Sequence, residues 1–130
     1  MTLPGGQEPQ HTILVVDDEE LIVQEIVEAL EFEGFEAIGV VDVDSALAVV
    51  SDQDSIRLII TDLRMPGKSG TDLIHSVKGM NKHDISFIVI SGHIDLASEN
   101  QNEALKHLKC ILRKPINIDL LLDQVRETMS

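Results

Sequence analysis

The sequence has no tryptophan and no tyrosine, and only three phenylalanines. Without such rings, the chain has no platform on which nucleic acid bases could stack. Basic residues are also scarce: 10 lysines and arginines stand against 23 aspartates and glutamates, a formal net charge of −13. A surface this acidic repels phosphate backbones and anionic lipid, so we expect neither nucleic acid nor membrane as a direct partner. The partners that such a surface would attract are cations and basic protein surfaces.

Cysteine is nearly absent as well. Cys110 stands alone, which excludes an intramolecular disulfide and a cysteine-rich zinc site, and we expect it to be a small buried core residue. No apolar run reaches the roughly 18 residues of a membrane span, and the opening MTLPGGQEPQ lacks the pattern of a signal peptide. We therefore expect a cytoplasmic protein, with residues 1–10 as a disordered lead-in and a single domain over residues 11–130.

Two hydrophobic periodicities alternate along that domain. Short apolar runs predict strands that are buried on both faces, and they lie at Ile13–Val16, Phe35–Val40, Leu58–Thr61, Phe87–Ile90 and Cys110–Leu112. Apolar residues at helical spacing, or polar stretches of helical length, predict helices between and after these runs, at Asp18–Glu33, Ala46–Val50, Gly70–Lys78, Asp95–His107 and Ile118–Met129. Gly34 predicts the end of the first helix, and Asp42 or Asp44 the N-cap of the second. The alternation indicates a (βα)5 fold of the α/β class, with a parallel sheet covered on both faces.

Polar side chains follow four of the predicted strands at the point where each strand ends. They are Asp17 and Asp18, Asp62, Ser91, and Lys114. The carboxyl ends of parallel strands meet at one edge of the sheet, so three carboxylates, a hydroxyl and an ammonium should converge there. Taken singly, each residue also has an ordinary explanation as a helix cap, a turn residue or a solvated charge. Those separate explanations would all have to hold at four strand ends at once, which is much less likely than any one of them alone.

Such a group suits phosphoryl chemistry around a hard cation. Clustered carboxylates repel one another unless a cation such as Mg²⁺, which prefers oxygen ligands, lies between them. An aspartate beside the metal can act as a nucleophile and form an aspartyl phosphate. Lys114 and Ser91 could then contact phosphoryl oxygens.

Four stretches in this order carry a resemblance to a known family. They are ILVVDDEE (Ile13–Glu20), IITDLRMPGKSG (Ile59–Gly70), IVISGH (Ile88–His93) and LRKP (Leu112–Pro115). From His11 to Met129 the chain resembles the receiver domain of a two-component response regulator. That family has a flavodoxin-like fold with the sheet order 2-1-3-4-5. The resemblance thus implies a signalling domain, which catalyses only its own phosphorylation and dephosphorylation.

The resemblance also implies roles for the residues at the strand ends. Asp62 matches the phospho-acceptor, which takes the phosphoryl group from a phosphohistidine of a sensor histidine kinase or phosphotransfer domain. Asp17 and Asp18 match the acidic pair that binds Mg²⁺ (or Mn²⁺) together with Asp62 and the backbone carbonyl of Arg64. Ser91 matches the switch hydroxyl and Lys114 the lysine that contacts the phosphoryl group. The Lys114–Pro115 peptide is typically cis in the family. Downstream, the resemblance implies an output domain or protein as partner and allows a phosphorylation-linked homodimer.

The sequence departs from the family pattern at one position. Ile111 stands three residues before the lysine, where the family usually carries tyrosine or phenylalanine. An isoleucine cannot make the inward ring movement of its relatives, so we expect the signal to be read through loop and backbone shifts or through another surface. Arg64 and His93, each two residues past a site residue, occupy positions that influence phosphoryl lifetime in the family.

Three other functions are open to the same fold. A phosphorylation-independent scaffold with constitutive partner binding is the main alternative, and Ile111 is the feature that favours it. A phosphohydrolase would want an acid two residues after the nucleophile, where Arg64 stands. A flavin-binding domain would need a phosphate loop where Asp17–Glu20 would repel phosphate.

Overall fold

The computed structural model describes residues 11–82, 84–92, 108 and 110–130. The proposed lead-in, the helix expected at 95–107, and His93 lie outside the described residues. Five strands and four helices are described. The strands are β1 Thr12–Val16, β2 Glu36–Val40, β3 Ile56–Asp62, β4 Ser86–Ser91 and β5 Cys110–Arg113; the helices are α1 Glu20–Phe32, α2 Val43–Asp52, α3 Gly70–Lys78 and α5 Ile118–Met129.

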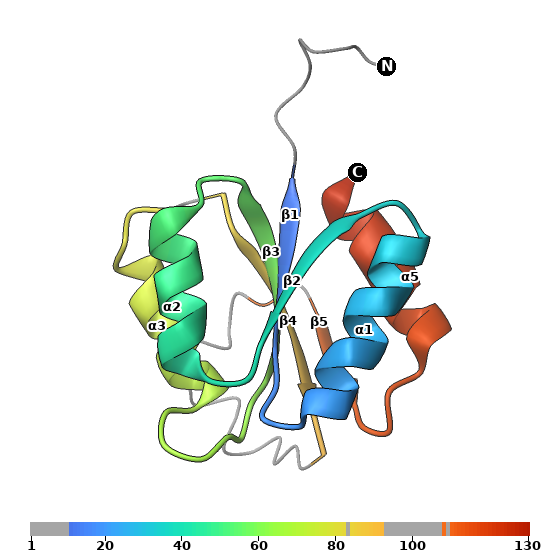
Figure 1. Ribbon diagram of the computed structural model, residues 1–130, viewed down its shortest axis with the longest axis horizontal. Helices are drawn as coiled ribbons and strands as arrows, with labels where there is room; N and C mark the ends of the chain where they lie inside the picture. The colour runs from blue at the N-terminus through green and yellow to red at the C-terminus, as the bar shows by residue number, and fades with distance from the viewer. Residues whose placement is uncertain (1–10, 83, 93–107, 109) are drawn as a thin grey trace, which may run out of the picture.

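All five strands pair in parallel, in the order β2-β1-β3-β4-β5. This is the flavodoxin-like order that the resemblance implied. Helices α2 and α3 cover one face of the sheet and α1 and α5 the other, so the molecule has three layers (Figure 1). None of the helices in the described part of the chain has the length and apolarity to cross a membrane.

Strand β1 shows how the sequence produces two cores. Successive side chains of a strand point to opposite faces of the sheet. Leu14 and Val16 accordingly pack with α2 and α3, whereas Ile13 and Val15 pack with α1 and α5. All four side chains are fully buried. The continuous apolar run of this strand is therefore the signature of helices on both faces.

Helix α1 is shorter than predicted. It begins at Glu20 rather than Asp18, because the Asp17 carboxylate accepts the backbone N–H of Glu19 at 2.8 Å and holds this segment extended. At the other end it stops at Phe32, one residue early, and Gly34 follows with a φ of 93°, as its position predicted. Helix α2 is longer than predicted, and Asp42 rather than Asp44 caps it by accepting the Ser45 N–H at 2.7 Å.

Cys110 is less buried than predicted. Cys110 lies on β5, an edge strand, and it is only half-buried against the core beneath α1 and α5. Burial, followed by the negative charge of Glu127, raises the pKa of the Cys110 thiol. The side chain is therefore held in its neutral form, in keeping with a packing role.

Candidate functional site

The carboxyl edge of the sheet brings the predicted residues together. Asp17 follows β1 directly, Asp62 and Ser91 are the last residues of β3 and β4, and Lys114 follows β5. In the register of the sheet, Asp62 lies beside Ile90, one residue before Ser91. The backbone carbonyl of Ser91 accepts the N–H of Lys114 at 3.0 Å, which ties the ends of β4 and β5 together.

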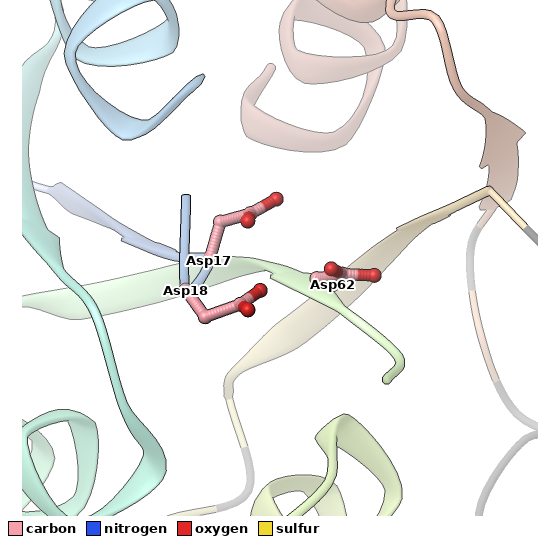
Figure 2. Close-up of side chains that lie close together, drawn as sticks. All are labelled: Asp17, Asp18 and Asp62. Atoms are coloured by element: carbon pink, nitrogen blue, oxygen red, sulfur yellow. The ribbon is translucent and has the colours of Figure 1, made fainter. Parts of the chain in front are cut away.

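The three aspartates converge on one point. Each of them offers a carboxylate oxygen, and these oxygens all lie within 4.8 Å of one another. Figure 2 shows Asp17 and Asp18 on the segment after β1, with Asp62 beside them. Asp17 is fully buried and Asp62 nearly so, whereas Asp18 is exposed to solvent. The cluster is thus anchored in the fold on one side and open to solvent on the other.

This donor set fits a hard divalent cation. It consists of carboxylate oxygens, which Mg²⁺ and Mn²⁺ prefer, without the thiolate or imidazole that favours zinc. Asp17 Oδ2 is buried and receives no hydrogen bond of good geometry from a described residue, although the Lys114 ammonium lies 3.0 Å away. A buried carboxylate oxygen in that condition is suited to a cation.

Lys114 supplies the positive charge of the site. Its Nζ lies 3.0 Å from Asp17 Oδ2 and 3.1 Å from Asp62 Oδ2, with its side chain only 17% exposed. A third carboxylate, Glu19, approaches it at 3.5 Å. Sequence reasoning missed Glu19 as a member of the site. The signal available was its place in the acidic run Asp17–Glu20, but that run does not reveal which residue faces Lys114.

Burial and charge act in opposite directions on these groups. Burial is the largest influence on Asp17 and, with the negative charge of Asp62, raises its pKa although the Glu19 N–H and the Lys114 ammonium act to lower it. Burial alone would lower the pKa of Lys114, but the close carboxylates of Asp17 and Asp62 raise it above the usual range. The lysine is therefore a fixed cation at neutral pH.

The two oxygens of Asp62 have different partners. Oδ1 accepts the backbone N–H of Leu63 at 2.7 Å, and Oδ2 accepts the Lys114 ammonium at 3.1 Å. The carboxylate is thus held in one orientation from both sides. An oriented, charged carboxylate beside a fixed cation is a competent nucleophile toward an electrophilic phosphorus.

Three further residues singled out in the sequence occupy different surroundings. The Ser91 side chain is buried at the edge of the site, with 1% of its surface exposed. Arg64 lies two residues beyond Asp62 on the β3–α3 connection, and its side chain is exposed. Ile111 lies on the edge strand β5 and is 37% exposed. The Lys114–Pro115 peptide is cis, as the resemblance implied.

Known proteins with similar sequences include a response regulator and a transcriptional regulatory protein. The chain is 34% identical over 114 residues to response regulator RR06 of Streptococcus pneumoniae, an alignment that covers 88% of this chain and 51% of that protein. It is 31% identical over 123 residues to the uncharacterized transcriptional regulatory protein YesN of Bacillus subtilis, covering 92% of this chain and 33% of YesN. The chain therefore spans about half of the first relative and about a third of the second.

Solved structures with the same fold are receiver domains. A response regulator receiver protein from Pseudomonas putida superposes with a TM-score of 0.85 at 30% identity, covering 93% of this chain and 99% of that chain. A receiver domain protein from Clostridium thermocellum gives 0.81 at 30% identity, covering 92% and 94% of the two chains. The family model of the response regulator receiver domain matches residues 13–126. The chain thus belongs to the response regulator receiver domain family of two-component signalling.

Proposed function

We propose that this domain accepts a phosphoryl group on Asp62 from the phosphohistidine of a sensor histidine kinase or phosphotransfer domain. The observation that carries the proposal is the convergence of Asp17, Asp18 and Asp62 within 4.8 Å, with the Lys114 ammonium 3.1 Å from Asp62 Oδ2. The chain spans only about half of one curated relative and a third of another, and we propose that its downstream partner is an output domain or a separate protein.

In this reaction a carboxylate oxygen of Asp62 forms a bond to phosphorus. The bond between phosphorus and the imidazole nitrogen breaks, and its electron pair stays on the nitrogen. Lys114 stabilises the negative charge of the transferring group, and the Ser91 hydroxyl donates to one of its oxygens. Hydrolysis reverses the state: a water oxygen bonds to phosphorus, the aspartyl bond breaks, and inorganic phosphate leaves Asp62 as a carboxylate.

The proposed metal ligands are Asp17, Asp18, Asp62 and the backbone carbonyl of Arg64, which would hold Mg²⁺ or Mn²⁺. The cation would neutralise charge that develops on the phosphoryl oxygens. Asp17, which is buried and directly follows β1, would fix the position of the cluster, while Asp18 is exposed to solvent. We also propose that the phosphoryl transfer takes place in the cytoplasm, with a protein as the phosphodonor.

The test is intact-mass analysis after incubation with acetyl phosphate and Mg²⁺. We expect the parent protein to gain one phosphoryl group, and Asp62→Asn and a chelator-treated sample to gain none. Asp52→Asn is the matched control, because it removes an exposed carboxylate at the end of α2 and should leave the gain intact. A gain that survives in Asp62→Asn would contradict the assignment of the acceptor.

A second candidate function is a scaffold that binds partners without phosphorylation. Ile111 favours it, since an exposed isoleucine replaces the ring through which relatives couple the site to the β5 surface. If neither acetyl phosphate nor beryllofluoride binds at Asp62, the scaffold becomes the better account. If the adduct forms, the response should be transmitted through loop and backbone shifts, because Ile111 lacks a ring to move inward.

A further inference from the structure

The backbone at Asp62 and Leu63 is held by hydrogen bonds to both of its carbonyl groups. The Thr61 hydroxyl donates to the Asp62 carbonyl at 2.8 Å, and the Gly70 N–H donates to the Leu63 carbonyl at 2.8 Å. The Leu63 N–H, which shares a peptide group with the Asp62 carbonyl, donates to Asp62 Oδ1 at 2.7 Å. The backbone around the proposed acceptor and the orientation of its side chain are therefore linked.

Thr61 is unusual among the residues of its strand. It is fully buried in the otherwise apolar part of β3, between neighbours Val16 on β1 and Val89 on β4. Valine has nearly the same shape and would suit such a strand position equally well. The hydroxyl is what distinguishes threonine here, and its hydrogen bond goes to the carbonyl of the acceptor residue.

Gly70 approaches the same peptide from the start of α3. A Cβ atom built on Gly70 would lie 2.2 Å from the Asp62 carbonyl oxygen and 3.0 Å from Leu63 Cα. Both contacts are with backbone, which cannot move aside as the tip of a flexible side chain can. Any side chain at position 70 would therefore displace either α3 or the peptide of the acceptor.

We propose that Thr61 and Gly70 are positioning residues for Asp62. They clamp the backbone at Asp62 and Leu63 so that the Leu63 N–H holds Oδ1 and leaves Oδ2 on the side of Lys114. The proposal rests on the proposed function of Asp62. It assigns a role in that function to two uncharged residues, whose contacts with Asp62 and Leu63 are made to the backbone.

The experiment compares hydroxyl removal at two places in the sheet. Thr61→Val removes the clamp, Thr61→Ser keeps the hydroxyl, and Thr12→Val is the matched control. Thr12 is a buried threonine on β1 whose hydroxyl pairs with Ser55 at 3.0 Å. For glycine, Gly70→Ala is compared with Gly79→Ala at the other end of α3, where the nearest atom to a new Cβ is at an ordinary 3.4 Å.

Three readouts separate positioning from stability: the thermal midpoint, the amide resonance of Leu63 without phosphodonor, and the initial rate of labelling by acetyl phosphate. We expect Thr61→Val and Gly70→Ala to shift the Leu63 amide and to slow labelling about tenfold or more. Thr61→Ser should stay within about twofold of the parent rate. Thr12→Val should lower the midpoint but leave both the Leu63 amide and the rate unchanged.

Two results would overturn the clamp. One is a Thr61→Val protein with the parent's Leu63 amide and labelling rate; the other is a Thr12→Val protein that loses as much rate as Thr61→Val. A parent protein that takes up no phosphoryl group would instead contradict the proposed function of Asp62. In that case the Leu63 amide still decides whether Thr61 and Gly70 hold the peptide.

Discussion

Lys114 compensates the negative charge of two carboxylates that the fold holds close together, Asp17 and Asp62. Asp17 is fully buried, and its charge is disfavoured there because no solvent surrounds it. The lysine ammonium lies about equally far from Asp17 and Asp62, at 3.0 and 3.1 Å, and so compensates both at once. A cation that enters the cluster would compete with the lysine for the same oxygens.

Replacing Lys114 with methionine keeps the aliphatic stem and removes the ammonium. Asp17 and Asp62 then face each other without a counter-charge. We expect the free energy of unfolding in chelator at pH 7 to fall by about 2 kcal/mol, and Mg²⁺ to restore part of the loss by binding only the folded state. Urea unfolding with and without Mg²⁺ measures both effects.

Lys68→Met is the control for that experiment. Lys68 pairs with Asp44 at 2.6 Å, but both side chains are largely exposed, at 57% and 76%. Exposed ion pairs contribute little to stability, so this variant should unfold like the parent. If Lys114→Met also unfolded like the parent in chelator, the lysine would not be the group that makes the cluster tolerable.

At the scale of single elements, the close approach of α1 to β2 depends on one glycine. A Cβ at Gly39 would lie 2.3 Å from Val23 Cγ1 and 3.2 Å from Val27 Cγ2, both on α1. Valine is branched at Cβ and has few rotamers to retreat into. Helix α1 in turn follows the loop that carries Asp17 and Asp18, so its seat on the sheet affects the site.

We expect Gly39→Ala to lower the free energy of unfolding by about 1–3 kcal/mol, because the added methyl group overpacks the α1–β2 interface. Combining it with Val23→Ala, which clears the nearest atom, should give a loss smaller than the sum of the single losses. Urea unfolding of the four proteins in this double-mutant cycle measures the coupling. Additive losses would contradict a direct clash between these two positions.

The bounds of an element could be predicted where a local sequence pattern determines them, but not where a tertiary contact does. The carboxyl ends of the strands were predicted to within one residue, because an apolar run followed by a polar residue is a local pattern. The ends of β1 and β2 match the prediction, whereas β3, β4 and β5 each extend one residue further. The start of α1 was not, since a tertiary requirement on the Asp17 side chain holds Asp18 and Glu19 out of the helix. The sheet order came from family resemblance alone, because periodicity does not specify which strands are neighbours.

The candidate site shows the same division. Asp17, Asp18, Asp62 and Lys114 could be predicted because each lies at the end of a strand or within two residues of it. Glu19 was missed because it does not lie at a strand end, and the acidic run does not show which of its side chains faces Lys114. Thr61 was read only as a strand residue, since nothing in the sequence says that its hydroxyl reaches the next carbonyl.

For the whole molecule, the net charge of −13 is a source of instability that ions relieve in two ways. Any salt screens the repulsion among acidic residues spread over the surface. A divalent cation that binds the cluster of Asp17, Asp18 and Asp62 stabilises the folded state further by mass action. The two effects can be separated, because screening depends on ionic strength and binding depends on the ion.

We expect the thermal midpoint of the parent to rise with NaCl and to rise further with MgCl₂ at the same ionic strength. Asp18→Asn should lose this second rise and keep the first, because Asp18 is exposed and its replacement leaves the core of β1 untouched. Thermal unfolding in the two salts measures the difference. Equal midpoints in both salts would mean that the acidic cluster only adds to the surface charge, and the lysine would then be its sole counter-ion. A difference confined to the parent would place the divalent ion at the point where β1 and β3 end, next to the carboxylate that we propose as the acceptor.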